Sequence, residues 1–353
     1  MPTFAIGVDL GGTNLRVAAV DSQGKMLEKI TTNTAVVTRS RDLVIDEMCS
    51  AIQQLTSKFL NDSNHLAGIG IGVPGIIEME TGTLRWSPNL PGWHDYPVHN
   101  EIERRLRTNV ILENDANAAA LGEKWLGAAA KVDDMCMITL GTGVGGGFVL
   151  AGKVWHGMSG MAAELGHLNV EQNGAPCNCG SRGCLEQYAS ATAVKRMAME
   201  AVSAGKAPEM ARAMKAGQDF NSKVIYQLAL DGDEPAREVF RRAGSALGTV
   251  VADLINALNL PMYVIGGGVA DAWDAFAPSM METVRKNSYV YQATAPPEGP
   301  HGGDAQPPRR STVITRALLG SDAGLVGAAR LPIVASEVAF DTTLARRNST
   351  RSL

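Results

Sequence analysis

Short apolar runs separated by tight turns make up the first third of the chain. An apolar run from Phe4 ends at Leu10, and a second run covers residues 15–20. Runs of this length bounded by Gly, Asp and Ser are typical of strands joined by turns. The pattern predicts three strands within residues 4–30, a helix over about 42–60 and a buried strand over 66–73.

The same order of elements recurs about 130 residues later. The predicted elements are a strand over 135–140, a glycine-rich turn over 141–147, a strand over 148–150 and another strand from Val154. The two copies share this plan but little sequence. Two such units predict two similar α/β lobes, each with one phosphate-binding turn, that face a shared cleft.

Helical periodicity dominates the second half of the chain. Helices are predicted over 192–204, 222–230 and 234–258. The other predicted elements are a strand from Met262 that runs into a third glycine turn at 266–268, a short strand over 311–315 and a helix over 322–331. The Pro- and Gly-rich residues 293–310 predict a mobile loop, and residues 334–353 predict a disordered tail.

The composition is that of a folded chain with a slightly acidic balance. Of 353 residues, 45% are hydrophobic and 19% are charged, which suits two domains or lobes of the usual size. The net charge of −4 offers no basic stripe for a phosphate backbone, so we expect no nucleic-acid partner. The lack of a long apolar run and of a signal-peptide pattern predicts no membrane span and a cytoplasmic location.

Three of the five cysteines lie close together, which predicts a metal site in a reducing compartment rather than a disulfide framework. The candidate ligands of a tetrahedral structural zinc ion are His167, Cys177, Cys179 and Cys184. The alternative is a group of reduced cysteines with no ion. Four protein ligands leave no open position, so we expect zinc to fix a loop. Cys49 and Cys136 lie in apolar segments and are expected to be buried.

Glycine is in excess, and 14 of the 38 glycines fall in the segments 11–12, 68–75, 141–147 and 266–268. Glycine turns bring backbone N–H groups together with no Cβ in the way, which suits a bound phosphate. A plain hairpin turn explains residues 11–12 equally well, but the five glycines in 141–147 exceed what a hairpin needs. Val154 excludes a Walker A loop, because that position requires a hydroxyl that binds Mg²⁺. A dinucleotide fingerprint is excluded because a strand, not a helix, follows residue 147.

Asn114 and Asp115 follow an apolar strand over 110–112 and precede a helix over 116–126. This position favours an N-cap, and it also suits a catalytic carboxylate. The dipole of the helix is expected to hold the pKa of Asp115 low.

Four segments together resemble the ROK family of bacterial sugar kinases, within the actin-like ATPase and sugar-kinase superfamily. They are Asp9–Arg16, Glu113–Glu123, Leu140–Gly147 and the cysteine segment, in which every fixed position of the family pattern is present. The resemblance extends from about residue 4 to residue 331. Asn14 departs from the pattern, because Lys is frequent at that position.

The resemblance implies the fold. We expect two actin-like (RNase H-like) α/β lobes with mixed sheets that flank a substrate cleft. The smaller N-terminal lobe would contain residues 1–119 and a C-terminal helix at about 316–333. The larger C-terminal lobe would contain residues 120–315 and the zinc loop. Family habit implies a homodimer.

The resemblance also implies an activity, the ATP-dependent phosphorylation of the 6-hydroxyl of a hexose. The loop from Pro88 to Trp93 looks most like that of glucokinases, so glucose is the expected substrate. Asp115 would be the catalytic base. The expected sugar contacts are Gly75, Asn89, Asn114, Asp115, Glu164, His167 and Glu186. Asp9 would lie near the nucleotide phosphates and hold Mg²⁺ through water. The other expected nucleotide contacts are Gly11, Gly12, Thr13, Asn14, Gly141, Thr142, Gly143, Val144, Gly145, Gly146, Gly266, Gly267 and Gly268.

Several alternatives stay open at this stage. The acceptor sugar could be N-acetylglucosamine, N-acetylmannosamine, fructose or mannose, and the phosphoryl donor could be polyphosphate. A ROK-type sugar-responsive transcription regulator shares the same body, but it carries an N-terminal winged helix, for which the turn after Asp9 leaves no room. A catalytically inactive sugar-binding protein is disfavoured by the presence of Asp115 and both glycine turns.

Overall fold

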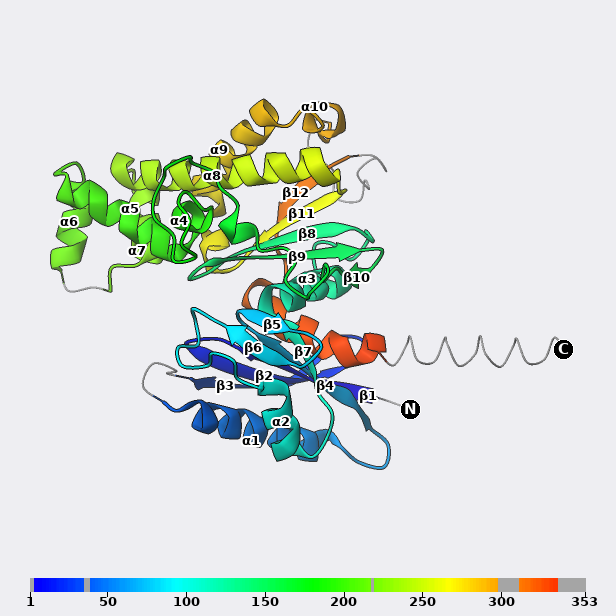
Figure 1. Cartoon of the computed structure of the whole chain (residues 1–353). Helices are drawn as coiled ribbons and strands as arrows, with labels where there is room; N and C mark the ends of the chain where they lie inside the picture. Colours follow the sequence, from blue (N-terminus) through cyan, green and yellow to red (C-terminus); the bar gives the residue numbers. More distant parts are fainter. Residues whose placement is uncertain (1–2, 35–38, 217–218, 298–310, 336–353) are drawn as a thin grey trace.

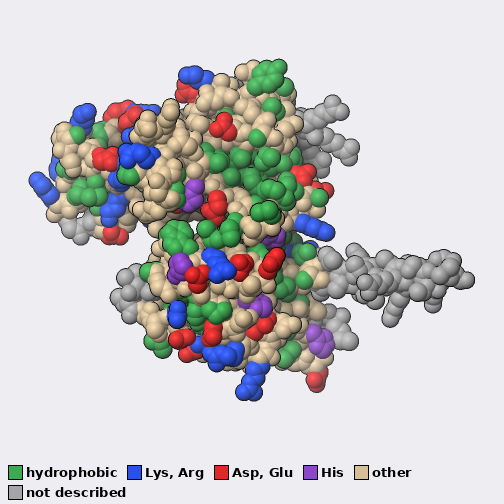
Figure 2. Space-filling model, viewed as in Figure 1, with side chains coloured by type: hydrophobic (Ala, Val, Ile, Leu, Met, Phe, Trp, Pro, Cys, Tyr) green, Lys and Arg blue, Asp and Glu red, His purple; other side chains and the backbone are tan. Residues whose placement is uncertain are grey.

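Two α/β lobes lie one above the other in the computed structural model, which describes residues 3–34, 39–216, 219–297 and 311–335 (Figure 1). Each lobe is built on a five-stranded mixed sheet. The outline narrows between the lobes in the space-filling view, and the face shown there has no extended patch of one charge sign (Figure 2). The expected fold class is confirmed.

The N-terminal sheet has the strand order β3-β2-β1-β4-β7. Its strands are β1 (Thr3–Leu10), β2 (Asn14–Asp21), β3 (Met26–Asn33), β4 (His65–Val73) and β7 (Ile111–Asn114). β1, β2 and β3 form an antiparallel meander, while β1, β4 and β7 run parallel. The carboxyl ends of the parallel strands therefore meet at one edge, where α/β sheets bind ligands.

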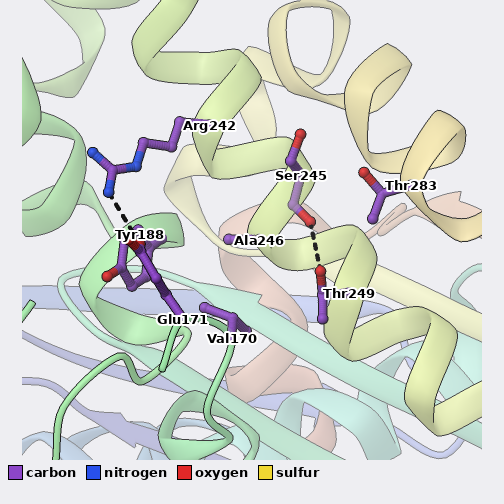
Figure 3. A pocket seen from close by; sticks show the side chains of 8 residues that line it. All are labelled: Val170, Glu171, Tyr188, Arg242, Ser245, Ala246, Thr249 and Thr283. Carbon is purple, nitrogen blue, oxygen red and sulfur yellow. Dashed lines mark hydrogen bonds and ion pairs between the residues drawn. The ribbon is translucent and has the colours of Figure 1, made fainter. Parts of the chain in front are cut away.

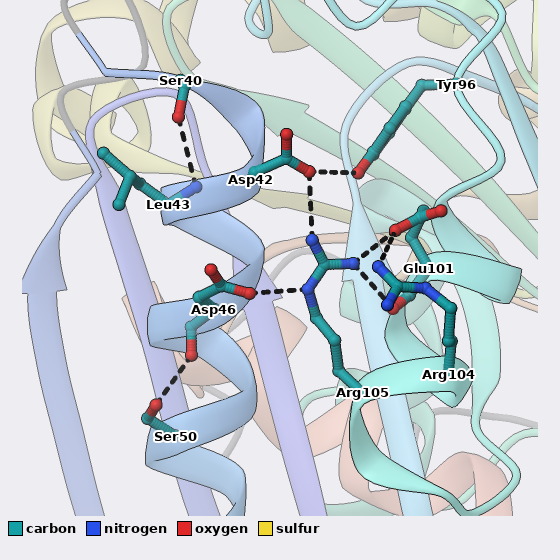
Figure 4. Close-up of polar contacts among 9 residues, drawn as sticks. All are labelled: Ser40, Asp42, Leu43, Asp46, Ser50, Tyr96, Glu101, Arg104 and Arg105. Carbon is teal, nitrogen blue, oxygen red and sulfur yellow. Dashed lines mark hydrogen bonds and ion pairs between the residues drawn. The ribbon is translucent and has the colours of Figure 1, made fainter.

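Helices cover both faces of the N-terminal sheet. α1 (Arg41–Phe59) and α2 (Val98–Leu106) lie on one face, and Arg105 of α2 bonds to Asp42 and Asp46 of α1 at 3.0 and 2.6 Å (Figure 4). A helix over residues 323–335 covers the other face, where Leu325 and Ala329 pack with strand residues. Gly70 of β4 allows this close contact, because a Cβ there would lie 1.9 Å from the carbonyl oxygen of Ala328.

The C-terminal sheet repeats the same plan, with the order β10-β9-β8-β11-β12. Its strands are β8 (Met135–Leu140), β9 (Val144–Leu150), β10 (Lys153–Val154), β11 (Met262–Gly266) and β12 (Val313–Arg316). β8 pairs with β9 antiparallel and with β11 parallel, as β1 does with β2 and β4. The repeat of plan predicted from the sequence is thus present in the strand order of both sheets.

α3 (Asp115–Leu126) lies between the two sheets and packs on β8 and β9 (Figure 1). The buried carboxylate of Glu123 near its end accepts hydrogen bonds from the backbone N–H groups of Ala128, Leu318 and Leu319 at 2.8, 3.1 and 2.8 Å. Both segments of chain that pass between the lobes are therefore tied to α3. Residue 119, the predicted lobe boundary, lies inside this helix, and the division of domains stays a prediction.

The opposite face of the C-terminal sheet carries most of the remaining helices. They are α4 (Glu186–Ala189), α5 (Ala191–Ser203), α6 (Pro208–Lys215), α7 (Ser222–Leu230), α8 (Glu234–Leu258), α9 (Trp273–Asn287) and α10 (Tyr291–Thr294). Short 3₁₀ turns are η1 (Leu165–His167), η2 (Gly268–Ala272) and η3 (Gly320–Asp322). Among the described residues, no helix combines the length and apolar character needed to cross a membrane.

The strongly periodic segments were predicted well, and α8 has the predicted bounds. The hairpin of β5 (Ile76–Glu78) and β6 (Thr83–Trp86), and the helices α2, α6 and α9, were not predicted. The predicted mobile loop and tail begin too early, because residues 293–294 belong to α10 and residues 334–335 to the helix over 323–335. The parts of these two predictions over 298–310 and 336–353 lie outside the described residues.

The predicted glycine turn over 141–147 is shorter than expected. β9 begins at Val144, so that Gly145, Gly146 and Gly147 belong to a strand. A Cβ at Gly147 would lie 3.0 Å from the carbonyl oxygen of Ala116, so this glycine lets α3 pack against β9. Part of the glycine excess therefore serves contacts between helix and sheet, as Gly70 also does.

Candidate active site

The start of α3 places Asp115 at the carboxyl end of β7. Asn114 is the N-cap, and its Oδ1 accepts hydrogen bonds from the backbone N–H groups of Ala116 and Asn117 at 2.9 and 3.2 Å. Its Nδ2 donates to the carbonyl oxygen of Gly75 at 3.2 Å. The capping alternative is therefore correct for Asn114, and the cap leaves Asp115 as the first helical residue.

The pKa of Asp115 is raised to about 7, chiefly because burial disfavours its charged form. The nearby carboxylates of Asp9 and Glu164 raise it further, while a hydrogen bond from the N–H of Ala116 opposes the shift. The expectation that the helix dipole would keep this pKa low is wrong, because desolvation and like charges outweigh it. A carboxylate with this pKa is suited to act as a base near neutral pH.

Asp9 lies at the end of β1 and forms an ion pair with Arg16 of β2. Arg16 also donates to the carbonyl oxygen of Ser321 and lies 3.8 Å from Asp322. Burial raises the pKa of Asp9, and Arg16 counteracts that rise. Arg16 therefore joins β1 and β2 through its ion pair with Asp9.

The first glycine turn contacts a predicted sugar loop. Gly11 donates to the carbonyl oxygen of Asn14 at 2.8 Å, which closes a tight hairpin. A Cβ at Gly12 would lie 2.6 Å from the carbonyl oxygen of Asn89. The structure therefore brings the segment from Gly11 to Asn14, with Thr13, against the loop of Asn89.

The second and third glycine turns lie side by side, because β8 and β11 are parallel neighbours and Gly266 pairs with Thr139. Gly141 donates to the carbonyl oxygen of Gly143 at 2.9 Å. Gly267 has a φ of +85°, and a Cβ there would lie 2.5 Å from the carbonyl oxygen of Leu140. Both turns end parallel strands at the same edge of the C-terminal sheet, with Thr142 and Gly268 exposed.

Glu164, His167 and Glu186 lie close to one another. Burial raises the pKa of Glu164, His167 lowers it and Glu186 raises it. Glu186 begins α4, and its Oε2 accepts a hydrogen bond from the backbone N–H of Val144 at 3.1 Å. A predicted sugar contact thus lies beside the predicted phosphate turn.

The predicted zinc ligands come together, with one donor atom from each of His167, Cys177, Cys179 and Cys184 all within 4.8 Å of one another. The Sγ atoms of Cys179 and Cys184 are 3.7 Å apart, as are Cys177 Sγ and His167 Nδ1. Zn–S bonds of about 2.3 Å in a tetrahedron require sulfur atoms at about this separation. The donor set therefore fits zinc. Cys49 and Cys136 are buried, as expected.

A shallow cavity of about 240 Å³ lies where residues 170–171 of the loop between His167 and Cys177 meet α4, α8 and α9 (Figure 3). Arg242 bonds to Glu171 at 3.1 Å and lies over the ring of Tyr188. The cavity is lined by Val170, Glu171, Tyr188, Arg242, Ser245, Ala246, Thr249 and Thr283. None of the predicted site residues lines it.

Sequence reasoning missed two polar residues next to Asp115. Glu113 is buried, with an exposed fraction of 2%, and His156 Nε2 lies 2.7 Å from its Oε2. Glu113 lies within the motif 113–123 and His156 shortly after the predicted strand start at Val154, but no local pattern in the sequence sets either residue apart. The two residues are far apart in the chain, so only the fold brings them together.

Known proteins of similar sequence and structure share one family. The sequence model of the ROK family matches residues 5–334. A glucokinase from Thermotoga maritima is 40% identical over 279 residues, which are 79% of this chain and 86% of that protein. A glucokinase from Halalkalibacterium halodurans is 37% identical over 326 residues, 91% of this chain and 92% of that protein. The crystal structure of a ROK family glucokinase from Streptomyces griseus in complex with glucose and AMPPNP aligns with a TM-score of 0.74 at 33% identity, covering 93% of this chain and 98% of that one.

Proposed function

This chain belongs to the ROK family, and from that membership we propose that it transfers the γ-phosphoryl group of ATP to the 6-hydroxyl of glucose. The observation that carries the proposal is the position of Asp115. Its carboxylate has a pKa near 7 and lies in the field of Asp9 and Glu164, between lobes that each present a glycine turn.

Asp115 orients the 6-hydroxyl of the sugar and accepts its proton as that oxygen attacks the γ-phosphorus, while the bond from the γ-phosphorus to the β–γ bridging oxygen breaks and ADP leaves. Phosphoryl transfer has a loose transition state, so that positioning and charge neutralisation contribute most of the rate. A base with a pKa near neutrality is deprotonated in a large share of the molecules at neutral pH and can take the proton late in the reaction. The sugar is held by Gly75, Asn89, Asn114, Glu164, His167 and Glu186.

In this proposal His167 is both a zinc ligand and a contact to the sugar. Its Nδ1 faces Cys177 Sγ at 3.7 Å, in the cluster that fits zinc. That leaves Nε2 to meet a sugar hydroxyl. Zinc bound by four protein groups would fix the ring and the loop that leads to Glu186.

The nucleotide lies along the glycine turns in this proposal. Backbone N–H groups of residues 11–14 and 141–146 hold the phosphates, and residues 266–268 lie on the adenosine side. Mg²⁺ near Asp9 would neutralise phosphate charge when bound. For this, Asp9 must exchange at least part of its contact with Arg16. We also propose that the protein works in a reducing cytoplasm, because zinc-binding thiols must stay reduced. From its membership of the ROK family we further propose that it forms a homodimer.

The test is a coupled assay of sugar phosphorylation with purified protein. Glucose, N-acetylglucosamine, N-acetylmannosamine, fructose and mannose are compared as acceptors, and ATP with polyphosphate as donors. The proposal requires the highest kcat/KM for glucose with ATP. A preference for an amino sugar, or no turnover with any sugar, contradicts it. Sedimentation of the same protein tests the dimer.

A further inference from the structure

Two titratable residues from different lobes meet next to the candidate base. His156 follows β10 in the C-terminal lobe, and Glu113 is in β7, an edge strand of the N-terminal sheet. His156 Nε2 and Glu113 Oε2 are 2.7 Å apart. His156 retains an exposed side-chain fraction of 36%, while that of Glu113 is 3%. A buried carboxylate is costly unless its oxygens are satisfied, so each of its partners matters.

The other partners of Glu113 lie on either side of Asp115. Its Oε1 accepts hydrogen bonds from the backbone N–H of Asn114 at 2.9 Å and from Nδ2 of Asn117 at 3.0 Å. The Oδ1 of Asn117 is buried and has no hydrogen-bond partner. The side chain of Asn117 is therefore held through its nitrogen by Glu113. One carboxylate thus fixes the residue before Asp115 and a residue in the turn that follows it.

His156 also begins the segment 156–164, which ends at Glu164. The carbonyl oxygen of His156 accepts a hydrogen bond from the N–H of Ala162 at 3.3 Å, which closes this segment on itself. Gly160 lies against the N-terminal lobe, where a Cβ would be 2.4 Å from Cγ of Met79. The segment that carries Glu164 is therefore attached to the opposite lobe at His156 and near Gly160.

We propose that His156 and Glu113 are positioning residues for phosphoryl transfer, which hold Asp115 and Glu164 in a fixed relation across the two lobes. This inference rests on the proposed function of the site. The Glu113 carboxylate fixes the backbone around Asp115, and the imidazole of His156 fixes both that carboxylate and the origin of the Glu164 segment. The hydrogen bond to Glu113 raises the pKa of His156, which strengthens the contact by favouring the imidazolium. Misplacement of reacting groups by about 1 Å can cost about a hundredfold in rate.

The test compares His156→Ala and His156→Gln in the full-length protein. The Gln amide can donate to Glu113, so it keeps the contact without the charge. We expect His156→Ala to lower kcat at least tenfold and to raise the KM for sugar, with little change in the KM for ATP. His156→Gln should recover most of the loss. Equal kinetic constants for His156→Ala and wild type, or equal losses in His156→Ala and His156→Gln, would overturn the proposal.

His99→Ala is the matched control, because His99 Nε2 also faces a glutamate, Glu103 of α2, at 3.2 Å, and the carbonyl oxygen of Val110 at 3.2 Å, so that both contacts stay within the N-terminal lobe. We expect wild-type kinetic constants for this variant. Thermal unfolding of both Ala variants separates lost stability from lost positioning. A drop in kcat that is the same in His99→Ala and His156→Ala contradicts a positioning role.

Hydrogen exchange gives a readout that does not depend on activity. The amide of Asn114 is held by Glu113, so exchange in residues 114–118 should be faster in His156→Ala than in wild type and unchanged in His99→Ala. Unchanged exchange in His156→Ala contradicts the inference. If wild type phosphorylates no sugar, the proposed function fails, and the exchange experiment still decides whether the contact fixes the segment around Asp115.

Discussion

The Oε2 of Glu186 accepts a hydrogen bond from the backbone N–H of Val144 at 3.1 Å. A residue predicted to hold the sugar is thereby bonded to a turn predicted to hold the phosphates. A Cβ at Gly143 would lie 2.3 Å from the same oxygen, so the carboxylate rests directly on the turn. A sugar that draws Glu186 away would free an N–H group for phosphate, which connects the two binding events.

Glu186→Ala should therefore weaken sugar binding and also reduce the effect of sugar on nucleotide affinity. A hydrogen bond to a charged group contributes about 1.5–3 kcal/mol, which corresponds to roughly a tenfold to hundredfold rise in the Kd for glucose. The dissociation constant of a non-hydrolysable ATP analogue is measured with and without glucose. If glucose changes that constant equally in wild type and variant, Glu186 does not connect the two sites.

Asp115→Asn should lower kcat by about two to four orders of magnitude, because the amide cannot accept the proton of the hydroxyl. The variant keeps the shape of the side chain, so the KM for glucose should change little. Circular dichroism and zinc content check that the protein is intact. Turnover within a few-fold of wild type would remove Asp115 from the role of base.

The activity should depend on pH through Asp115. The pKa of its carboxyl is raised to about 7, and only the deprotonated form accepts a proton, so kcat should rise with pH through about 7. Glu164 raises the pKa of Asp115 by charge repulsion, so Glu164→Gln should move this limb of the profile to lower pH. A carboxyl with a pKa of about 7 titrates between roughly pH 5 and 8. A kcat that stays constant over that range speaks against a raised pKa of Asp115.

The same pKa predicts an opposite trend in stability. A carboxyl with a folded-state pKa above its unfolded value binds more protons in the folded state. Its contribution to stability is complete below about pH 4 and is lost as the pH rises through about 7. Asp115→Asn lacks this loss, so ligand-free Asp115→Asn should unfold at a higher temperature than wild type at pH 8. The difference in melting temperature should shrink as the pH falls to about 5.

Removal of zinc should abolish sugar binding and leave nucleotide binding nearly unchanged. In the proposal, zinc fixes His167 and the loop that leads to Glu186, while the predicted nucleotide turns at 11–14, 141–146 and 266–268 are formed by strand ends outside that loop. Cys177→Ser and treatment with a chelator are compared by titration with glucose and with an ATP analogue. Cys49→Ser is the control, because Cys49 is buried in α1. Equal losses for both ligands after chelation would contradict a role of zinc confined to the sugar side.

Local patterns in the sequence were sufficient for the elements whose physics is local. The apolar periodicity of residues 234–258 predicted α8, and the spacing of Cys177, Cys179 and Cys184 predicted their cluster with His167. The Asn-Asp pair before an apolar helix predicted the N-cap of α3. In each case the residues that decide the structure are neighbours in the chain.

Features that depend on contacts between distant parts of the chain could not be predicted from local sequence patterns. The pKa of Asp115 depends on burial and on Asp9 and Glu164, which lie in other segments of the chain. Gly147 was read as part of a ligand turn, although the close approach of α3 accounts for it. The pairing of His156 with Glu113 arises only when both lobes are in place.

The cap on α3 has a thermodynamic consequence. Asn114 orders the first turn of the helix, so the backbone of Asp115 is fixed before any substrate arrives. Ordering one flexible residue costs about 1–2 kcal/mol in conformational entropy. Had the proposed base been in a loop, that cost would reduce the free energy of substrate binding or raise the barrier to reaction. Here the entropy is lost when the protein folds, and the contacts with sugar and nucleotide remain available to favour the transition state.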